Sequence, residues 1–597
     1  MRGTALAFAL ALAPALLAAP ARALDTTLSA PGASDALTER LTAASAVMAA
    51  QARGRDTPQD LLAAALADYR TLIQVLYDAG HFSPVISIRL NGREASEIRP
   101  AALPARIDRV EIAVQPGPQF RFGRAEIGPL APHTELPESY RKGQIATTGA
   151  IRDAAIAGID GWRQAGHAKA DIGAQKITAI HPRAELAAEI RLAPGPRLRF
   201  GRMTITGDTD VRPESIHAIA GFPTGEIYDP DQLQKVGTRL RRTGSFSTVA
   251  LREADTPNPD GTLDVEARFE DMPKRHLAFG AELSSREGLD LTMTWMHRNL
   301  FRRANRLRFE ASIRNIGGDE DIDGRLGLRL DRPDVLGPDD SMFYMAELER
   351  LNRTHFESWR ALAGIGVRRS FSDKLYGELA ATLRHSRADD AFGSDRRFTY
   401  FALPGQVQWD RRDNPVDARD GFYVNAELMP FLGLAGTKSG ARLYLDGRAY
   451  QGFAGDRFVL AGRLQIGSLM GAAQDAVSPD LLFFSGGAGS VRGQPYESLG
   501  VPVPPAGAIA GGRSFLGASL ELRGRVSERI WLVGFYDYGA VDADPFVDRH
   551  SASHSGAGLG LRYDLGGFGP IRFDLAYPVS GSTGDGLQFY LGIGQAF

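Results

Sequence analysis

The sequence contains no cysteine and only 11 histidines in 597 residues. Without cysteine the chain has no disulfide framework, no thiol nucleophile and no thiolate metal site. The histidines are scattered, and no H-E-x-x-H, P-loop or G-x-S-x-G pattern occurs. We therefore expect no catalytic residues, no metal site and no cofactor, and the protein is predicted not to be an enzyme.

A strong charge of one sign and long apolar runs are missing as well. The formal net charge is -2, which argues against a nucleic-acid partner and against a polybasic membrane-surface protein. No stretch beyond the N-terminus has the roughly 20 apolar residues of a membrane-spanning helix. The length predicts several domains, and any membrane crossing is expected to use β-strands.

The first residues have the pattern of a targeting segment. Arg2 is followed by an apolar run, and Ala21-Arg22-Ala23 forms a small-x-small cleavage site. We interpret residues 1–23 as a signal peptide that is cleaved before Leu24, so the mature protein is expected to be exported. The alternative is an N-terminal membrane anchor, which the shortness of the apolar run disfavours.

A repeat follows. Residues 116–124 read Pro-Gly-Pro-Gln-Phe-Arg-Phe-Gly-Arg, and residues 194–202 read Pro-Gly-Pro-Arg-Leu-Arg-Phe-Gly-Arg, with an offset of 78 residues. Gly166 and Gly244 have the same offset and each follows a helical run, as a helix C-cap does. A fixed period indicates tandem modules. We predict three of them, over residues 24–118, 119–196 and 197–272.

Each module is expected to have the order β-α-α-β-β. The opening strand of the first, at residues 24–28, is weak, and residues 34–50 are open to interpretation as a free helix. Sheet edges in such modules can bind an extended client by strand addition, and the alternative is that the modules are only spacers. For the second module the predicted elements are strand 122–127, helix 151–165, strand 170–177 and strand 185–192.

From about His276 onward, short segments alternate between polar and apolar residues. Each covers about ten residues, which suits a tilted strand that crosses a bilayer. We predict a 16-stranded antiparallel transmembrane β-barrel over residues 273–597; a soluble β-sandwich is the alternative. The segments start near residues 276, 288, 304, 323, 341, 358, 375, 397, 421, 439, 457, 513, 529, 555, 570 and 586.

Residues 469–512 form a long loop between strands eleven and twelve. The loop combines aromatic residues and glycines with an arginine, Arg492, whereas disordered linkers are poor in aromatics. Strand parity places Asp537 of strand thirteen and Arg562 of strand fourteen inside the barrel. A guanidinium in a narrow lumen gains from a bidentate carboxylate. The alternatives are a surface loop and an Asp537 that faces channel water.

The loop and strand thirteen carry motifs of a known family. Phe484-Ser485-Gly486-Gly487 with Val491-Arg492-Gly493, and Phe535-Tyr536-Asp537-Tyr538-Gly539, resemble the sixth-loop and F-x-D-x-G motifs of the BamA/TamA superfamily. Gln494 stands where that family usually has an aromatic residue. The repeats resemble POTRA domains, and their number is nearest the TamA branch. The resemblance implies a loop–barrel lock formed by Val491, Arg492, Gly493, Phe535, Asp537, Gly539 and Arg562.

The same resemblance implies a function. The barrel is expected in the outer-membrane bilayer with the POTRA domains in the periplasm. Its clients are expected to be unfolded outer-membrane or autotransporter proteins, and its partner a TamB-like protein anchored in the inner membrane. The alternatives are a two-partner-secretion transporter and a passive channel or lipid-transfer conduit.

The seam, where the first and last barrel strands pair, is the predicted lateral gate. Gly592 and Gly594 thin the last strand, which ends at Phe597, and glycine offers no side chain to its neighbours. A weak seam opens sideways and lets a client strand pair with the exposed edge. The alternative is that the glycines only make room for the loop.

Overall fold

The computed structural model describes most of the chain, and the predicted signal peptide lies outside the described residues. The chain forms two compact units, and the third module belongs largely with the barrel. Among the described helices, none has both the length and the apolar character needed to span a bilayer. The described residues are 24–55, 57–284, 288–318, 321–565, 570–584 and 586–593.

The first module has a four-stranded sheet in the order β1-β4-β2-β3 and three helices rather than the expected two. The extra helix begins at Ser45, whose Oγ donates to the buried carboxylate of Asp68 at 2.6 Å. Asp68 also accepts from the backbone N–H of Ala46 at 2.6 Å, which satisfies the start of that helix. The elements are β1 Asp25–Ser29, α1 Asp35–Ala44, α2 Ala46–Ala52, α3 Pro58–Asp78, β2 Val85–Leu90, β3 Arg93–Glu94 and β4 Arg109–Gln115.

The second module has a three-stranded sheet in the order β5-β7-β6 and one α-helix, so the predicted second helix is wrong here. The segment before α4 contains Pro129, Pro132 and Pro137, which lack an N–H and disrupt helices. Tyr140 fills this space, and burial raises the pKa of its hydroxyl to about 12. The elements are β5 Arg121–Gly128, α4 Thr148–Gln164, β6 Asp171–Ile180 and β7 Glu185–Ala193.

The third module has the predicted β-α-α-β-β order, with its sheet in the order β8-β10-β9. Its core includes Ala304 from a barrel turn. The backbone N–H of Arg212 donates to the carbonyl of Arg302 at 2.8 Å. The third module and the barrel therefore pack together across the predicted boundary at residue 272. The elements are β8 Arg199–Thr206, α5 Pro213–Ala220, α6 Pro230–Arg242, β9 Phe246–Glu253 and β10 Thr262–Asp271.

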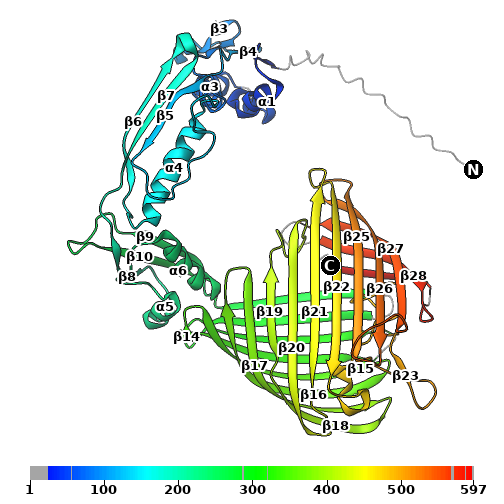
Figure 1. Cartoon of the computed structure of the whole chain (residues 1–597). Helices are drawn as coiled ribbons and strands as arrows, with labels where there is room; N and C mark the ends of the chain where they lie inside the picture. The colour runs from blue at the N-terminus through cyan, green and yellow to red at the C-terminus, as the bar shows by residue number, and fades with distance from the viewer. Residues whose placement is uncertain are drawn as a thin grey trace, which may run out of the picture. The chain divides into compact units, whose positions relative to one another are not determined.

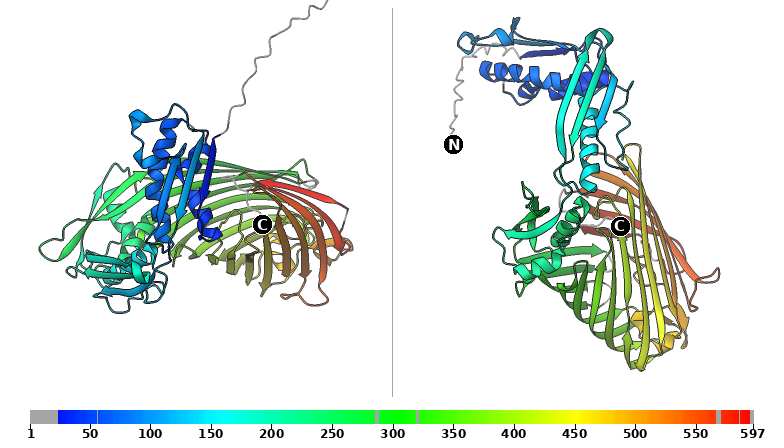
Figure 2. Two further views of the ribbon diagram at one scale, coloured as in Figure 1. Left: turned by 90° about the horizontal axis from the view of Figure 1, so that it is seen from above. Right: turned by 60° about the vertical axis from the view of Figure 1, so that its left-hand side comes forward.

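The strands from β11 to β22 and from β25 to β29 close into an antiparallel barrel (Figures 1 and 2). The predicted number of sixteen is confirmed, because β18 and β19 are two parts of one strand that both pair with β17 and β20. Pro404 lies at the break, where it cannot donate to the ladder. The strands are β11 Arg275–Ser284, β12 Gly288–Leu300, β13 Asn305–Ile316, β14 Asp323–Gly337, β15 Asp340–Arg353, β16 Phe356–Ser370, β17 Leu375–Asp390, β18 Gly393–Ala402, β19 Gly405–Asp410, β20 Gly421–Ala435, β21 Gly440–Phe453, β22 Phe458–Met470, β25 Ser514–Arg525, β26 Ile530–Asp542, β27 Ala552–Asp564, β28 Pro570–Ser580 and β29 Gln588–Ile593.

Side chains alternate between the two faces of the wall as the sequence predicts. On β26, Leu532 and Tyr536 are exposed on the outside, whereas Phe535 and Asp537 are buried inside. A charge on the outer face costs about 2–4 kcal/mol at mid-bilayer, so this alternation determines which residues reach the lumen.

Candidate functional site

The loop between β22 and β25 is packed inside the barrel. Phe483 is buried among wall residues that include Tyr400 and Phe515. Isolated bridges pair Phe483 with Gly512 and Ser485 with Leu499, so the loop has internal structure. It also contains the short strands β23 Val501–Val503 and β24 Ala508–Ala510. A surface loop, the alternative considered from the sequence, does not agree with this burial.

Arg492 and Asp537 are in direct contact. Nε of Arg492 donates to Oδ2 of Asp537 at 2.7 Å, and Nη2 donates to Oδ1 at 3.0 Å. The backbone N–H of Arg492 adds a third bond to the same carboxylate at 3.1 Å. Both side chains are buried. The contact is therefore a bidentate, charge-assisted pair, the strong form of this interaction.

Two further carboxylates complete the surroundings of Arg492. Its Nη1 donates to Glu521 at 2.8 Å and to Asp574 at 3.0 Å. Glu521 also pairs with Arg523 at 2.9 Å, and Asp574 pairs with Arg562. Three arginines thus balance three carboxylates away from water. An ion-paired cluster of this kind holds a segment in place and leaves no group poised as a nucleophile.

The other face of the guanidinium lies on an aromatic ring. Cζ of Arg492 is 3.6 Å from the centroid of the Phe535 ring, which is the geometry of a cation–π contact. Val491 is fully buried beside it. The structure therefore brings Val491, Phe535 and Arg562, all named from the sequence, to the same place as the Arg492–Asp537 pair.

Glycines set how closely the loop approaches the wall. Gly493 has φ +87°, and a Cβ there would lie 2.8–3.0 Å from backbone atoms of Tyr577, so only glycine fits. A Cβ on Gly539 would lie 2.8 Å from Cγ2 of Val491. Gly556, which sequence reasoning missed, faces the Arg492 carbonyl.

Two further glycines of β27, Gly558 and Gly560, lie near the lock. A Cβ on Gly558 would meet Phe535 and the backbone of β28. A Cβ on Gly560 would meet Asp574 and Arg562. These two glycines make room for neighbouring wall residues.

Gln494 is satisfied as a polar residue. Its Nε2 donates to the carbonyls of Ser555 at 2.8 Å and Ser580 at 3.0 Å. Its Oε1 accepts from the Thr583 hydroxyl at 2.8 Å. The side chain is fully buried, and the amide makes three hydrogen bonds that an aromatic ring lacks.

Three residues of this site were not assigned to the lock from the sequence: Glu521, Asp574 and Tyr590. The Tyr590 hydroxyl on the last strand accepts from the backbone N–H of Gly493 at 3.2 Å. Strand parity is consistent with luminal positions for Asp574 and Glu521, but parity alone does not select which luminal carboxylates meet Arg492.

The seam is described over three residue pairs, Glu282–Gly592, Leu283–Leu591 and Ser284–Tyr590. Gly592 faces the lumen between Glu282 and Arg572. Gly594 and Phe597, which the sequence assigned to the seam, lie outside the described residues.

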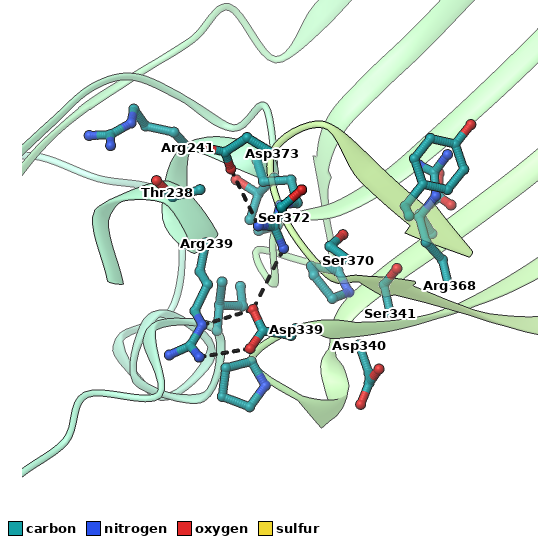
Figure 3. Close-up of a pocket in the computed structure, with 18 of the residues that line it drawn as sticks. Thr238, Arg239, Arg241, Asp339, Asp340, Ser341, Arg368, Ser370, Ser372 and Asp373 are labelled. Atoms are coloured by element: carbon teal, nitrogen blue, oxygen red, sulfur yellow. Dashed lines mark hydrogen bonds and ion pairs between the residues drawn. The ribbon is translucent and has the colours of Figure 1, made fainter. Parts of the chain in front are cut away.

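A polar cavity away from the lock lies where α6 meets the rim of the barrel, and its volume is about 560 Å³. In Figure 3 the Arg239 guanidinium points at Asp339, to which it donates at 2.7 and 3.0 Å. This hydrogen bond holds the pKa of Asp339 below its usual value. The contact holds the third module against the turn between β14 and β15.

Comparison with known protein families gives matches to the barrel and to the third module. The model of the Omp85 superfamily domain matches residues 299–597. The POTRA model, described as a surface antigen variable number repeat, matches residues 198–270, which lie in the third module. The two modules before it contain a four-stranded and a three-stranded sheet.

Solved structures share the fold. BamA from Haemophilus ducreyi lacking POTRA domains 1–3 aligns with a TM-score of 0.62 at 15% identity, over 80% of this chain and 100% of that chain. CdiB from Acinetobacter baumannii aligns with a TM-score of 0.50 at 13% identity, over 80% of this chain and 90% of that chain.

Proposed function

This chain belongs to the Omp85 superfamily of outer-membrane insertion and translocation proteins, and from that premise we propose that it assembles autotransporter-type clients. In this proposal the periplasmic modules receive an unfolded client, and the seam between β11 and β29 opens to template its strands. The protein acts as an assembly factor and not as an enzyme.

The observation that carries the proposal is the loop held inside the barrel by Arg492. Cavities beside the loop measure about 350 and 490 Å³, the size of small-molecule pockets. A folded client or a strand hairpin does not fit into such spaces. With the lumen occupied, a route through the wall at the seam is the better supported one.

The second module supports the receiving step. β6 is an edge strand, and its residues from Asp171 to Thr178 are exposed on both faces. Such an edge presents unpaired backbone groups to an extended chain. Ile172 and Ile177, both exposed, pair with Leu192 and Ala188 across a bulge, which places both isoleucines on one face of the strand, where they give an incoming segment apolar contacts.

The number of modules supports the TamA branch. Three sheet-and-helix modules precede the barrel. We propose that all three are POTRA domains, over residues 24–118, 119–196 and 197–272, and that a TamB-like partner anchored in the inner membrane binds them. The likeness to CdiB concerns the fold alone, and it leaves a two-partner-secretion transporter and a lipid-transfer conduit as outcomes of the test.

A disulfide across the seam tests the proposal. Leu283 and Leu591 are directly paired, at a separation that suits a disulfide, and the chain has no cysteine of its own. The Leu283→Cys/Leu591→Cys protein, reconstituted in vesicles, is expected to lose assembly of an autotransporter barrel when oxidised and to regain it on reduction.

The matched control is Leu348→Cys/Ala361→Cys, a directly paired position between β15 and β16 away from the seam. Oxidation there is expected to leave assembly intact. In both proteins the barrel must stay folded, as shown by a heat-dependent mobility shift on gels. Full assembly with the seam disulfide formed would exclude lateral opening, and lipid or ion flux without assembly would favour the conduit.

A further inference from the structure

Three residues form a row across the seam on the luminal face. Gly592 of β29 pairs directly with Glu282 of β11 on one side and with Arg572 of β28 on the other. Nη2 of Arg572 donates to Oε1 of Glu282 at 2.5 Å. The ion pair therefore joins β28 to β11 and passes over the last strand without involving a side chain of that strand.

The absence of a side chain at Gly592 permits this crossing. A Cβ at that position would lie 3.4 Å from Oε1 of Glu282 and 3.5 Å from Nη2 of Arg572. Alanine is thus accommodated at ordinary contact distance, whereas a longer side chain would occupy the space where the pair meets. Gly592 serves the closed seam instead of only thinning the strand.

The same ion pair is continuous with the loop–barrel lock. Nε of Arg572 lies 3.9 Å from Oδ2 of Asp574, the oxygen that accepts from Arg492 at 3.0 Å. A second connection runs through Tyr590, which pairs with Ser284 across the seam while its hydroxyl accepts from Gly493. The loop tip and the seam thus share residues.

We propose that Arg572 and Glu282 form a clamp that keeps the seam closed across the last strand, and that Asp574 couples this clamp to Arg492. Arg572 and Glu282 are both positioning residues. When the seam opens, Glu282 leaves with β11, and Arg572 turns to Asp574. When Arg492 is withdrawn, Asp574 loses a cation and attracts Arg572 away from Glu282, so release of the loop loosens the seam. This inference rests on the proposed lateral opening and identifies the residues that control it.

Backbone hydrogen exchange in the purified full-length protein tests the clamp, because exchange reports the fraction of time that strands are unpaired. In Glu282→Gln the amides on the two sides of the seam are expected to exchange roughly two- to fivefold faster, the range for a partly exposed ion pair. In Arg572→Lys, which keeps the charge of the pair, the seam amides are expected to exchange faster than in the unchanged protein but more slowly than in Glu282→Gln. Unchanged exchange at the seam would overturn the clamp.

Two controls separate the clamp from general loosening. Glu357→Gln removes an ion pair with Arg350 at 2.9 Å between β15 and β16, with exposure like that of Glu282, and is expected to leave the seam unchanged. Gly592→Ala is expected to keep the slow exchange, and Gly592→Leu to lose it. Fast exchange in Gly592→Ala, or equal exchange in both glycine variants, would contradict the crossing geometry.

A double-mutant cycle tests the coupling. In an Arg492→Gln background, Glu282→Gln is expected to change seam exchange by less than about 1.5-fold, because the clamp is already weakened there. Effects that multiply would show that the loop and the seam are independent. These measurements need no client, so a failure of the proposed assembly function leaves them standing. Assembly activity with an unresponsive seam would refute the clamp alone.

Discussion

Replacing Arg492 with alanine is expected to release the loop from the barrel wall. The change removes the arginine that contacts all three buried carboxylates, Glu521, Asp537 and Asp574. Removing one partner of a buried ion pair costs about 3–5 kcal/mol, since the remaining charge stays desolvated and unpaired. At about 1.4 kcal/mol per tenfold change, the docking equilibrium of the loop is expected to shift by roughly two to three and a half orders of magnitude.

Hydrogen exchange of the amides of residues 485–494 in the folded barrel measures this shift. Arg492→Lys is the graded control, because an ammonium keeps the charge but loses the bidentate contact; an intermediate acceleration is expected. Asp537→Ala is expected to act like Arg492→Ala, and the double variant to fall short of their sum by about 0.5–3 kcal/mol. Loop exchange that changes less than about tenfold in Arg492→Ala, or additive single effects, would refute the reasoning.

Three further outcomes follow from the geometry. Gly556→Ala is expected to loosen the loop by about 1–3 kcal/mol, because the new Cβ meets the Arg492 carbonyl; Gly462→Ala on β22, where a Cβ meets nothing within 4 Å, is the control, and equal exchange of the loop amides in both would contradict this. Gln494→Leu is expected to cost about 1–3 kcal/mol of loop docking, since it removes the amide that donates to the carbonyls of Ser580 and of the buried Ser555, and protease sensitivity of the loop measures it. Burial raises the pKa of Tyr140 from 10.0 to about 12, so the stability that the neutral hydroxyl contributes is complete below pH 10 and is lost as the pH rises through about 12. Urea unfolding of the second module is expected to show a loss of about 2–3 kcal/mol over that interval, and Tyr140→Phe is expected to remove this pH dependence.

Much of the barrel could be predicted because a bilayer imposes a local rule on the sequence. The starts of β12, β14, β17, β20 and β28 coincide with the predicted residues, since polar and apolar residues must alternate in a strand with lipid on one side. The same parity placed Asp537 and Arg562 in the lumen. Together with the family motif, it was enough to pair Asp537 with Arg492, whose contact the structure shows.

The helical modules were harder to predict. The two Pro-Gly-Pro segments and the glycines that end the helices identified the repeat. The number of helices in each module depended on contacts and prolines that a periodic pattern does not reveal. Three prolines prevent a helix before α4. In the first module, a buried Asp68 on a later helix supplies the partner for an additional helix start. Such a contact joins residues more than twenty positions apart, so a local pattern does not reveal it.

The sequence by itself determined the strand faces, the position of the long loop and the identity of the arginine at its tip, because each follows from alternation or from a short motif. Only the tertiary structure decided which carboxylates surround Arg492 and which ion pair crosses the last strand at Gly592. Glu521, Asp537 and Asp574 come from three strands, and Glu282 reaches Arg572 across an intervening strand. These meetings depend on strand register and barrel closure, and a one-residue slip in pairing would move every side chain to the other face.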